Sequence, residues 1–341
     1  MKIHQMSAGF QYGDAISSEM VSIASLLRSN GISGKIFADN IGYDPTSEAS
    51  AGLPILNSQD ILIYHYSIDS NLQGKLNNLK CRKWFVYHNV TPSQYFEPYD
   101  LKFSYLLREG RSQLKKMSNQ FEKRFAVSKY NTLELKNLGW QGVETIPLHL
   151  RQLSSSKEFH SNKRNNFISV GRIAPNKRQD DLIRFMKVWK DLGLPKKKLT
   201  LIGFCNPSLT EYKSLLEFMI RLYDLEDTIE FKNQVNEAEL IQMYCESEAL
   251  ISMSEHEGFC VPILEAMQNE LPVFAFAGGA VEETMGGAGI LFKKKDFKRL
   301  AFLINEILTD LPFKNELIIS QKERWENYKT YQNTNNILKY I

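Results

Sequence analysis

The 341-residue sequence has few cysteines and no long apolar run. Its four cysteines, Cys81, Cys205, Cys245 and Cys260, have no short paired spacing. This argues against a disulfide framework or a zinc site and fits a reducing compartment. No apolar run reaches the roughly 18 residues of a membrane-spanning helix. The first residues lack the apolar stretch of a secretory signal, so we expect a cytoplasmic protein.

A strong excess of one charge is also missing, because 42 Lys and Arg face 39 Asp and Glu and the formal net charge is +3. This balance does not by itself predict nucleic acid binding. A local excess lies in residues 108–124, with six basic and two acidic side chains beside apolar ones. One interpretation is a basic amphipathic helix on an anionic membrane surface. The other is a solvated helix face over a domain core.

The length and the patterning predict two α/β domains. A chain of this length is long for a single core, and strand-like apolar runs alternate with helical spacing, which predicts mostly parallel sheets. We expect an N-terminal domain over residues 1–150 and a second domain over 167–315. The polar stretch 151–166 is interpreted as a linker, and 316–341 as a C-terminal helix that crosses back to the first domain.

The N-terminal half opens with a pattern typical of a Rossmann-like domain. A strand over 2–6 is followed by a glycine-bearing loop over 7–14, a helix over 15–29 and a strand over 35–38. The spacing of Gly9 and Gly13 is not the dinucleotide fingerprint, so a nicotinamide cofactor is poorly supported. Gly13 would let the backbone approach a phosphate, or it serves only the turn.

Two histidines lie near the ends of the next predicted strands. His88 follows the strand over 83–87, and His65 lies near the end of the strand over 60–66. The carboxyl ends of parallel strands are where such folds bind ligands. His88 is therefore a candidate site residue, with a structural hydrogen bond as the alternative, and His65 has weaker support.

A strand, a tight loop and a helix start are predicted around residues 249–268. The strand covers 249–253, the loop 254–260, and Pro262 lies in the first helical turn. Free amides and the positive end of the helix dipole bind phosphate at such a place. Glu257 lies in the loop and Glu265 on the helix, where a carboxylate can accept both hydroxyls of a ribose. A plain strand-to-helix turn with two solvated carboxylates is the alternative.

Two cations occupy another predicted loop, after the strand over 166–170. Arg172 offers a planar fork of donors and Lys177 a compact charge, which together suit a diphosphate. Two exposed surface cations are the alternative interpretation.

These motifs resemble those of the family-4 retaining glycosyltransferases. The resemblance depends on Glu257-Gly258-Phe259 with Pro262 and Glu265, and on the Gly-Arg and Lys motif of Arg172 and Lys177. It implies an α/β fold with two Rossmann-like domains facing a cleft, the GT-B architecture. Cys260 departs from the pattern, because a glycine is common at that position.

The resemblance also implies roles for the site residues. Glu257 would position the donor sugar, and His88 would hold its hydroxyls or the acceptor. Glu265 would bind the ribose, and the backbone near Val235 the nucleobase. The donor diphosphate would be held by Arg172, Lys177, Gly13, Phe259, Cys260 and Val261.

The expected activity is transfer of a hexose, with retention of configuration, from a nucleotide-diphosphate sugar to a hydroxyl of a saccharide or lipid-linked saccharide. Mannose from GDP-mannose is the expected donor on family frequency, and surface polysaccharide or glycoconjugate assembly is the expected process. No Asp-x-Asp motif occurs, and the resemblance implies no metal and no cofactor. Peripheral contact with the inner membrane face through 108–124 follows from the first interpretation of that run.

Three alternatives remain open from the sequence. The same fold can serve a sugar-nucleotide epimerase or hydrolase, or a non-catalytic sugar-nucleotide-binding subunit. Intact Arg172, Lys177, Glu257 and Glu265 argue against the non-catalytic subunit. Nucleic acid binding has only the basic run 108–124 to support it.

Overall fold

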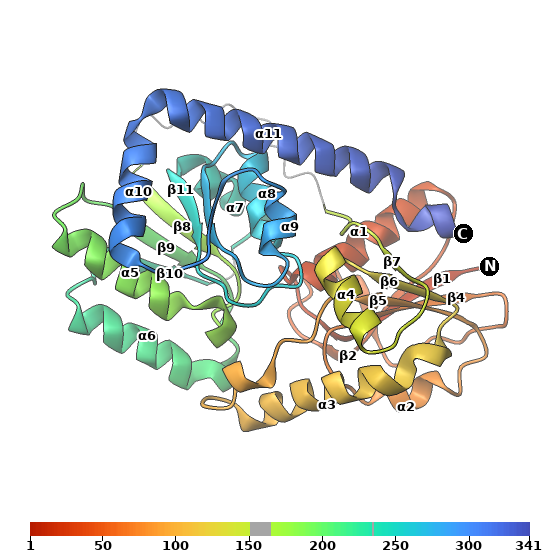
Figure 1. Cartoon of the computed structure of the whole chain (residues 1–341). Helices are drawn as coiled ribbons and strands as arrows, with labels where there is room; N and C mark the ends of the chain where they lie inside the picture. Colours follow the sequence, from red (N-terminus) through yellow and green to blue (C-terminus); the bar gives the residue numbers. More distant parts are fainter. Residues whose placement is uncertain (151–164, 234) are drawn as a thin grey trace. The chain divides into compact units, whose positions relative to one another are not determined.

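The computed structural model describes residues 1–150, 165–233 and 235–341, and the chain divides into two compact units (Figure 1). Unit 1 comprises Met1–Gln94, Leu101–Arg151 and Thr330–Ile341. Unit 2 comprises Tyr95–Asp100 and Gln152–Lys329. The predicted linker, 151–166, lies almost entirely outside the described residues.

Within the described residues, unit 1 is built on a seven-stranded parallel sheet in the order β3-β2-β1-β4-β5-β6-β7. The order reverses between β1 and β4, and such a reversal leaves a ligand-binding crevice at the carboxyl ends of the strands. The strands are β1 (Ile3–Phe10), β2 (Ile36–Ile41), β3 (Ala49–Ala51), β4 (Ile61–Tyr66), β5 (Arg82–Tyr87), β6 (Lys123–Ala126) and β7 (Val143–Thr145). The helices are α1 (Ala15–Ser29), α2 (Leu72–Leu76), α3 (Leu101–Met117) and α4 (Lys129–Asn137).

Unit 1 is held together by a buried sheet and an aromatic core. All six residues of β4 are buried, as expected for a parallel strand covered on both faces. The ring of Phe85 lies 4.6 Å from that of Trp140 and 4.8 Å from that of Phe121. Helix α1 has the predicted bounds, and the carboxylate of Asp14 caps it by accepting the amide of Ile16 at 3.1 Å.

Unit 2 contains a six-stranded parallel sheet in the order β10-β9-β8-β11-β12-β13 across its described residues. Its order reverses between β8 and β11. The strands are β8 (Asn166–Val170), β9 (Lys198–Ile202), β10 (Ile229–Lys232), β11 (Ala249–Ser252), β12 (Val273–Phe276) and β13 (Ile290–Phe292). The helices are α5 (Gln179–Asp191), α6 (Thr210–Leu222), α7 (Glu237–Glu246), α8 (Val261–Gln268), α9 (Val281–Met285), α10 (Phe297–Thr309) and α11 (Leu311–Thr334), the last of which runs on into unit 1.

The end of the chain differs from the predicted helix over 316–341. Helix α11 begins earlier, at Leu311, and ends at Thr334, and a short 3-10 helix over Ile337–Tyr340 follows. Within unit 1, the amide side chain of Gln332 both accepts from and donates to the backbone of Leu150. The hydroxyl of Tyr340 donates to Glu144 at 2.8 Å. These contacts place the last residues in the same unit as the first strand.

The predicted loop over 7–14 is shorter in the structure, because β1 continues to Phe10 and includes Gly9. The loop after β12 contains the short helix α9. Both segments have weak local signals: Gly9 disfavours a strand locally but is tolerated there by pairing with β2.

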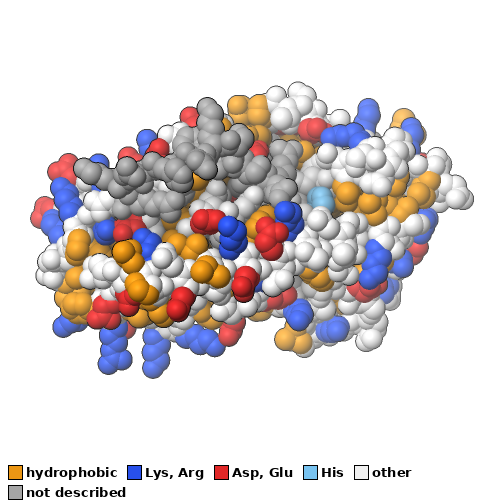
Figure 2. All heavy atoms as spheres, turned by 90° about the horizontal axis from the view of Figure 1, so that it is seen from above, with side chains coloured by type: hydrophobic (Ala, Val, Ile, Leu, Met, Phe, Trp, Pro, Cys, Tyr) orange, Lys and Arg blue, Asp and Glu red, His pale blue; other side chains and the backbone are white. Residues whose placement is uncertain are grey.

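The basic run 108–124 is not one helix. Helix α3 ends at Met117, and Lys123 and Arg124 lie on β6. The apolar side chains of the run, Leu114, Met117 and Phe121, and the adjacent Leu107 are buried in the core of unit 1. The structure therefore favours a solvated helix face over a core, because the apolar side is not available to a membrane. On the face that Figure 2 shows, basic and acidic side chains are interspersed.

Candidate functional site

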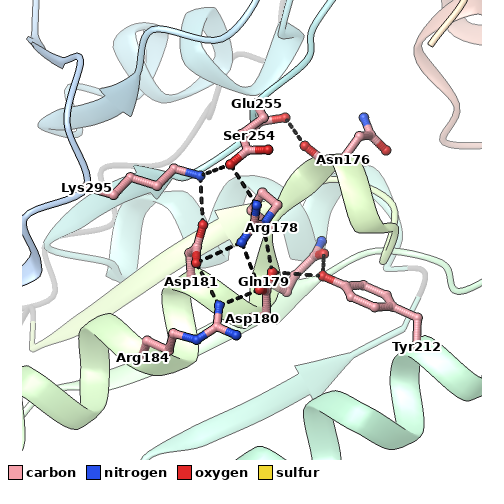
Figure 3. Close-up of polar contacts among 10 residues, drawn as sticks. All are labelled: Asn176, Arg178, Gln179, Asp180, Asp181, Arg184, Tyr212, Ser254, Glu255 and Lys295. Atoms are coloured by element: carbon pink, nitrogen blue, oxygen red, sulfur yellow. Dashed lines mark hydrogen bonds and ion pairs between the residues drawn. The ribbon is translucent and has the colours of Figure 1, made fainter. Parts of the chain in front are cut away.

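In unit 2, the loops that follow β8 and β11 meet where the strand order reverses. Asn176, in the first loop, accepts the backbone amide of Glu255 at 2.9 Å and the hydroxyl of Ser254 at 3.3 Å (Figure 3). Its side-chain amide donates to the carbonyl of His256 at 3.2 Å. Three hydrogen bonds from one residue thus clip together two loops that are about eighty residues apart in the sequence.

This clip brings Lys177 against Glu257. The Nζ atom of Lys177 lies 2.7 Å from both carboxylate oxygens of Glu257. Glu257 is buried; burial alone would raise its pKa, but the charge and hydrogen bonds of Lys177 hold the pKa below its ordinary value. Glu257 is therefore an ionised carboxylate at neutral pH. The sequence had assigned Lys177 to the diphosphate and Glu257 to the sugar, without predicting that they pair.

Arg172 is the second predicted cation of this loop. Its side chain is exposed, and it has no ion-pair partner within the part of the chain that the structure describes. Its backbone carbonyl accepts the side-chain amide of Gln179 at 3.0 Å, which fixes the loop. The guanidinium is thus a charge that a ligand can engage.

Helix α8 begins directly after this loop. Cys260 precedes it in a left-handed conformation with φ 78°, which explains why glycine is common at this position in the resembling family. Burial and the nearby Glu257 raise the pKa of the Cys260 thiol well above its ordinary value, so the thiol stays protonated. Pro262 has no amide hydrogen, and the amide of Ile263 donates to the carbonyl of Cys260 at 3.2 Å, so the amide of Val261 is the donor that this helix start offers to an anion.

The side chain of Phe259 is directed elsewhere. It is buried, and its ring centre lies 5.5 Å from that of Tyr328 on α11. The hydroxyl of Thr284 donates to its carbonyl. Phe259, which was predicted to bind the diphosphate, can therefore contribute only its backbone amide to such a site.

Two glycines after β12 let another loop pack against the Glu257 loop. A Cβ on Gly278 would lie 2.2 Å from the carbonyl oxygen of Ser254, and one on Gly279 would lie 2.3 Å from that of Glu257. The amide of Ala280 donates to the same Glu257 carbonyl at 2.9 Å. The backbone that carries Glu257 is therefore supported from two sides.

Glu265 lies in the second turn of α8 and is partly buried. Its carboxylate accepts the hydroxyl of Tyr244, on α7, at 2.8 Å. Burial raises the pKa of Glu265 to about 7, against the opposing effect of the Tyr244 hydrogen bond. Val235, predicted to be near the nucleobase, is partly buried just before Asn236, which caps α7 together with Glu239.

A charged network beneath these loops was not predicted (Figure 3). Arg178, at φ 56°, donates to Glu255 at 2.7 Å, and Lys295 donates to Glu255 at 2.8 Å and to Asp181 at 2.7 Å. Burial opposes the ionisation of Glu255, but Lys295 and Arg178 hold its pKa below the ordinary value. The network is completed by Asp180, Arg184 and Tyr212. It joins the start of α5, Tyr212 on α6 and the loops after β11 and β13, so no single local spacing in the sequence indicates the whole network.

In unit 1, His88 belongs to a buried polar cluster that sequence reasoning found only in part. Its Nε2 lies 2.9 Å from Nδ1 of His65, whose Nε2 lies 3.0 Å from Oε1 of Gln5. A carboxylate oxygen of Glu19 lies 3.4 Å from Nε2 of His88. His88 is 9% exposed, and the other three are 1–2% exposed. Gln5 on β1 and Glu19 on α1 were not predicted as members of this cluster. The only signal for them in the sequence is that each is a polar residue within an apolar pattern.

Glu19, His65 and His88 lie close enough together to hold a metal ion. The 2.9 Å between the two ring nitrogens is shorter than the roughly 3.3 Å edge of a tetrahedral zinc site with bonds of about 2.0–2.1 Å. It matches an N–H···N hydrogen bond. The geometry therefore fits a shared proton better than a shared metal.

The loop after His88 is fixed by further polar contacts. Asn89, at φ 81°, donates to both Asn131 and Glu134 at 2.8 Å. Arg111, part of the basic run, donates to the carbonyl of Val90 at 2.9 Å and pairs with Glu134 at 2.7 Å. Gly13, in the turn before α1, has φ 80°, which the turn requires.

Comparison with known proteins identifies the family of this chain. The family described as "Glycosyl transferases group 1" matches residues 151–324, about half of the chain. The chain belongs to this family.

Two curated proteins are similar in sequence to part of this chain. The O-antigen chain mannosyltransferase RfbU of Salmonella typhimurium is 30% identical over 145 residues, which cover 42% of this chain and 39% of RfbU. The capsular polysaccharide biosynthesis glycosyltransferase CapM of Staphylococcus aureus is 26% identical over 203 residues, 56% of this chain and 50% of CapM. The chain thus spans half or less of the length of these relatives.

Solved structures show the fold of this group 1 protein over almost its whole length. The Anabaena Alr3699/HepE structure, in complex with UDP and glucose, has a TM-score of 0.76 at 17% identity and covers 98% of each chain. The glycosyltransferase WaaG, involved in lipopolysaccharide biosynthesis, has a TM-score of 0.70 at 12% identity, covering 98% of this chain and 99% of its own. The predicted fold class, two parallel-sheet α/β domains of the GT-B type, is confirmed. Among the described residues, no helix is both long and apolar enough to cross a bilayer.

Proposed function

We propose that this chain is a family-4 retaining glycosyltransferase that transfers a hexose from a nucleotide-diphosphate sugar to a hydroxyl of a saccharide or lipid-linked saccharide. The observation that carries the proposal is the arrangement in unit 2 of a cation, a buried carboxylate and a helix start. Lys177 and Glu257 pair at 2.7 Å beside the first turn of α8. Glu265 lies one turn further along that helix.

The negative charge of the leaving diphosphate would be taken by three groups. Arg172 supplies a planar fork, Lys177 a compact charge, and the start of α8 the amide of Val261 and the positive end of the helix dipole. Because these groups already provide positive charge, the proposed reaction needs no metal and no cofactor. The donor diphosphate would compete with Glu257 for Lys177, and the carboxylate would then be able to accept hydroxyls of the donor sugar.

We assign no covalent nucleophile. Glu257 is ionised, but Nζ of Lys177 donates hydrogen bonds to both of its carboxylate oxygens. In the proposed mechanism the bond between the anomeric carbon and the diphosphate oxygen breaks, and the acceptor oxygen bonds to the anomeric carbon on the same face. The leaving diphosphate takes the proton of the acceptor hydroxyl. His88 would contact hydroxyls of the sugar or of the acceptor.

The nucleotide part would be fixed by Glu265. A ribose has two adjacent hydroxyl donors, and a carboxylate accepts both when it is ionised. Because the pKa of Glu265 lies at about 7, binding of the ribose and loss of the proton are coupled near neutral pH. The backbone near Val235 would contact the nucleobase.

Mannose from GDP-mannose is the first donor to test, because RfbU is named a mannosyltransferase. UDP-glucose is the second, because the HepE structures hold UDP with glucose and UDP-glucose. A role in surface polysaccharide assembly is supported by the names of RfbU and CapM.

Calorimetric titration of the full chain with GDP, UDP, GDP-mannose and UDP-glucose tests the donor site. We expect micromolar binding of one nucleotide that is lost in Glu265→Ala and kept in Glu246→Ala, a matched change on the exposed face of α7. Binding should be unchanged by EDTA. Absence of binding to all four would refute the proposal.

Product analysis then separates transfer from its alternatives. With a saccharide acceptor, we expect a new glycosidic bond whose anomeric configuration, read by proton NMR coupling, equals that of the donor. Free sugar as the main product would indicate a hydrolase, and a changed sugar still attached to the nucleotide would indicate an epimerase.

A further inference from the structure

We propose that Gln5 and His65 are positioning residues that fix the tautomer of His88, so that His88 meets its ligand with Nδ1 as a hydrogen-bond acceptor. The ligand class is a hydroxyl-bearing sugar. This inference rests on the proposed function, because it concerns how a predicted site residue of that reaction is set.

The contacts of the Gln5 side chain fix the orientation of its amide. Its Nε2 donates to the backbone carbonyl of Met20 at 2.8 Å, and this leaves Oε1 facing His65. A carbonyl oxygen can only accept a hydrogen bond. The ring nitrogen at 3.0 Å from it, Nε2 of His65, must therefore carry a hydrogen.

The proton on Nε2 of His65 decides the state of its other nitrogen. His65 is 1% exposed, and burial lowers its pKa to about 3, so the ring is neutral. A neutral imidazole has one N–H, so Nδ1 of His65 has a free lone pair. The contact of 2.9 Å to His88 then requires that Nε2 of His88 donate.

The hydrogen on Nε2 of His88 likewise decides the state of its other ring nitrogen. Burial, with a further effect of His65, lowers the pKa of His88 well below its ordinary value, so this ring is also neutral. With its single hydrogen on Nε2, its Nδ1 is left as an acceptor. One amide orientation on β1 thus sets the hydrogen-bonding character of a side chain on the loop after β5.

Glu19 is the ionisable group that faces both rings. One of its oxygens lies 3.4 Å from Nε2 of His88 and 4.0 Å from Nδ1 of His65. Burial raises the pKa of Glu19 to about 8, against the opposing effect of the His149 backbone amide. At neutral pH the carboxyl group is therefore mostly uncharged and does not draw a second proton onto His88.

A purely structural role would use the same contacts, since they tie β1, β4 and β5 together. The two roles differ in what they need from Gln5. The positioning role needs only the oxygen that faces His65, whereas a structural tie also needs the nitrogen that donates to Met20. Gln5→Glu keeps an acceptor and loses the donor, and Gln5→Leu loses both.

Ring-nitrogen NMR of the full chain, labelled with ¹⁵N-histidine, reads the tautomers directly. We expect His65 and His88 as Nε2–H tautomers between pH 5.5 and pH 7.5. His4 is an internal control, because this buried histidine of β1 has no hydrogen-bond partner for its ring nitrogens among the described residues. In Gln5→Leu, both rings should move to Nδ1–H, and Gln5→Glu should keep the tautomers of the unmodified protein.

Kinetics on the same proteins tests the consequence. We expect kcat to fall at least tenfold in Gln5→Leu with little change in the donor KM, and to recover most of its value in Gln5→Glu. A His88 with Nδ1–H in the unmodified protein would overturn the proposal. So would equal loss of kcat in both variants, or a shifted tautomer with unchanged kcat.

Donor binding is measured in parallel on the unmodified protein. Its absence there refutes the proposed function, whereas the tautomers test the hydrogen-bond relay without any donor. The two failures are therefore distinguishable.

Discussion

Replacing Glu19 by Gln is expected to remove a pH dependence of stability from unit 1. In the folded chain burial raises the pKa of this carboxyl from 4.5 to about 8. The folded state therefore keeps a proton that the unfolded state loses above pH 4.5. Stability from this group is fully present below pH 4.5 and is lost progressively as the pH rises to about 8. Glutamine has nearly the same shape and cannot ionise, so the variant lacks this loss.

The magnitude follows from the pKa difference of about 3.5 pH units. At 1.36 kcal/mol for each pH unit, Glu19 removes at most about 5 kcal/mol of stability between pH 4.5 and pH 8. His65 acts in the opposite direction, because its pKa of about 3 makes the folded state lose stability as the pH falls below 6.5. Comparing the variant with the unmodified protein at each pH cancels most of that contribution.

Urea unfolding followed by tryptophan fluorescence, at pH 5 and at pH 9, measures the effect. At each pH, the free energy of unfolding of the unmodified protein is subtracted from that of Glu19→Gln. We expect this difference to be several kcal/mol larger at pH 9 than at pH 5. Glu109→Gln, the same change on the partly exposed surface of α3, is the control and should show no such gain. An equal difference at both pH values for Glu19→Gln would refute the reasoning.

Three further predictions concern unit 2. Lys177→Met should lower kcat by about 100-fold, and it should destabilise the chain by about 3 kcal/mol because Glu257 is left buried and unpaired. Initial rates measure the first effect and urea unfolding the second. Unchanged stability would contradict the pairing of Lys177 with Glu257. Nucleotide affinity, measured by calorimetry, should rise between pH 6 and pH 8 as Glu265 ionises. In Glu265→Gln the affinity should not change over this pH range. An equal rise in the variant would exclude Glu265 as the source of the pH dependence. Gly279 has φ 62°, and Gly279→Ala would place a Cβ 2.3 Å from the carbonyl oxygen of Glu257, so the variant should bind the donor at least tenfold more weakly. Normal donor affinity in the variant would show that the loop can move away at little cost.

Much of the fold could be predicted because periodicity is a local property. Helix α1 and strand β8 have the predicted bounds. The missed elements are short: β3 has three residues and α9 has five. Such segments gain their stability from neighbours rather than from their own sequence.

The site was predictable only where chemistry and spacing coincide in one stretch. Arg172 with Lys177, and Glu257 with Glu265, lie in short motifs and could be named; their roles stay predictions. Their surroundings could not be named, because the network of Arg178 with Glu255 and Lys295 joins three loops. The cluster around His88 joins two strands, a helix and a loop. Contacts of this kind are set by topology, which places distant residues side by side.

The placement of Thr330–Ile341 in unit 1 has a consequence for synthesis on the ribosome. Domains usually complete their folding in the order in which they are made, N-terminal first. Here unit 1 lacks its contacts from Gln332 and Tyr340 until residues 330–341 have been made. Unit 2, whose last residue is Lys329, can acquire all of its chain earlier. Strands β1 to β7 are therefore translated before unit 2, but the unit that they form is completed only after unit 2.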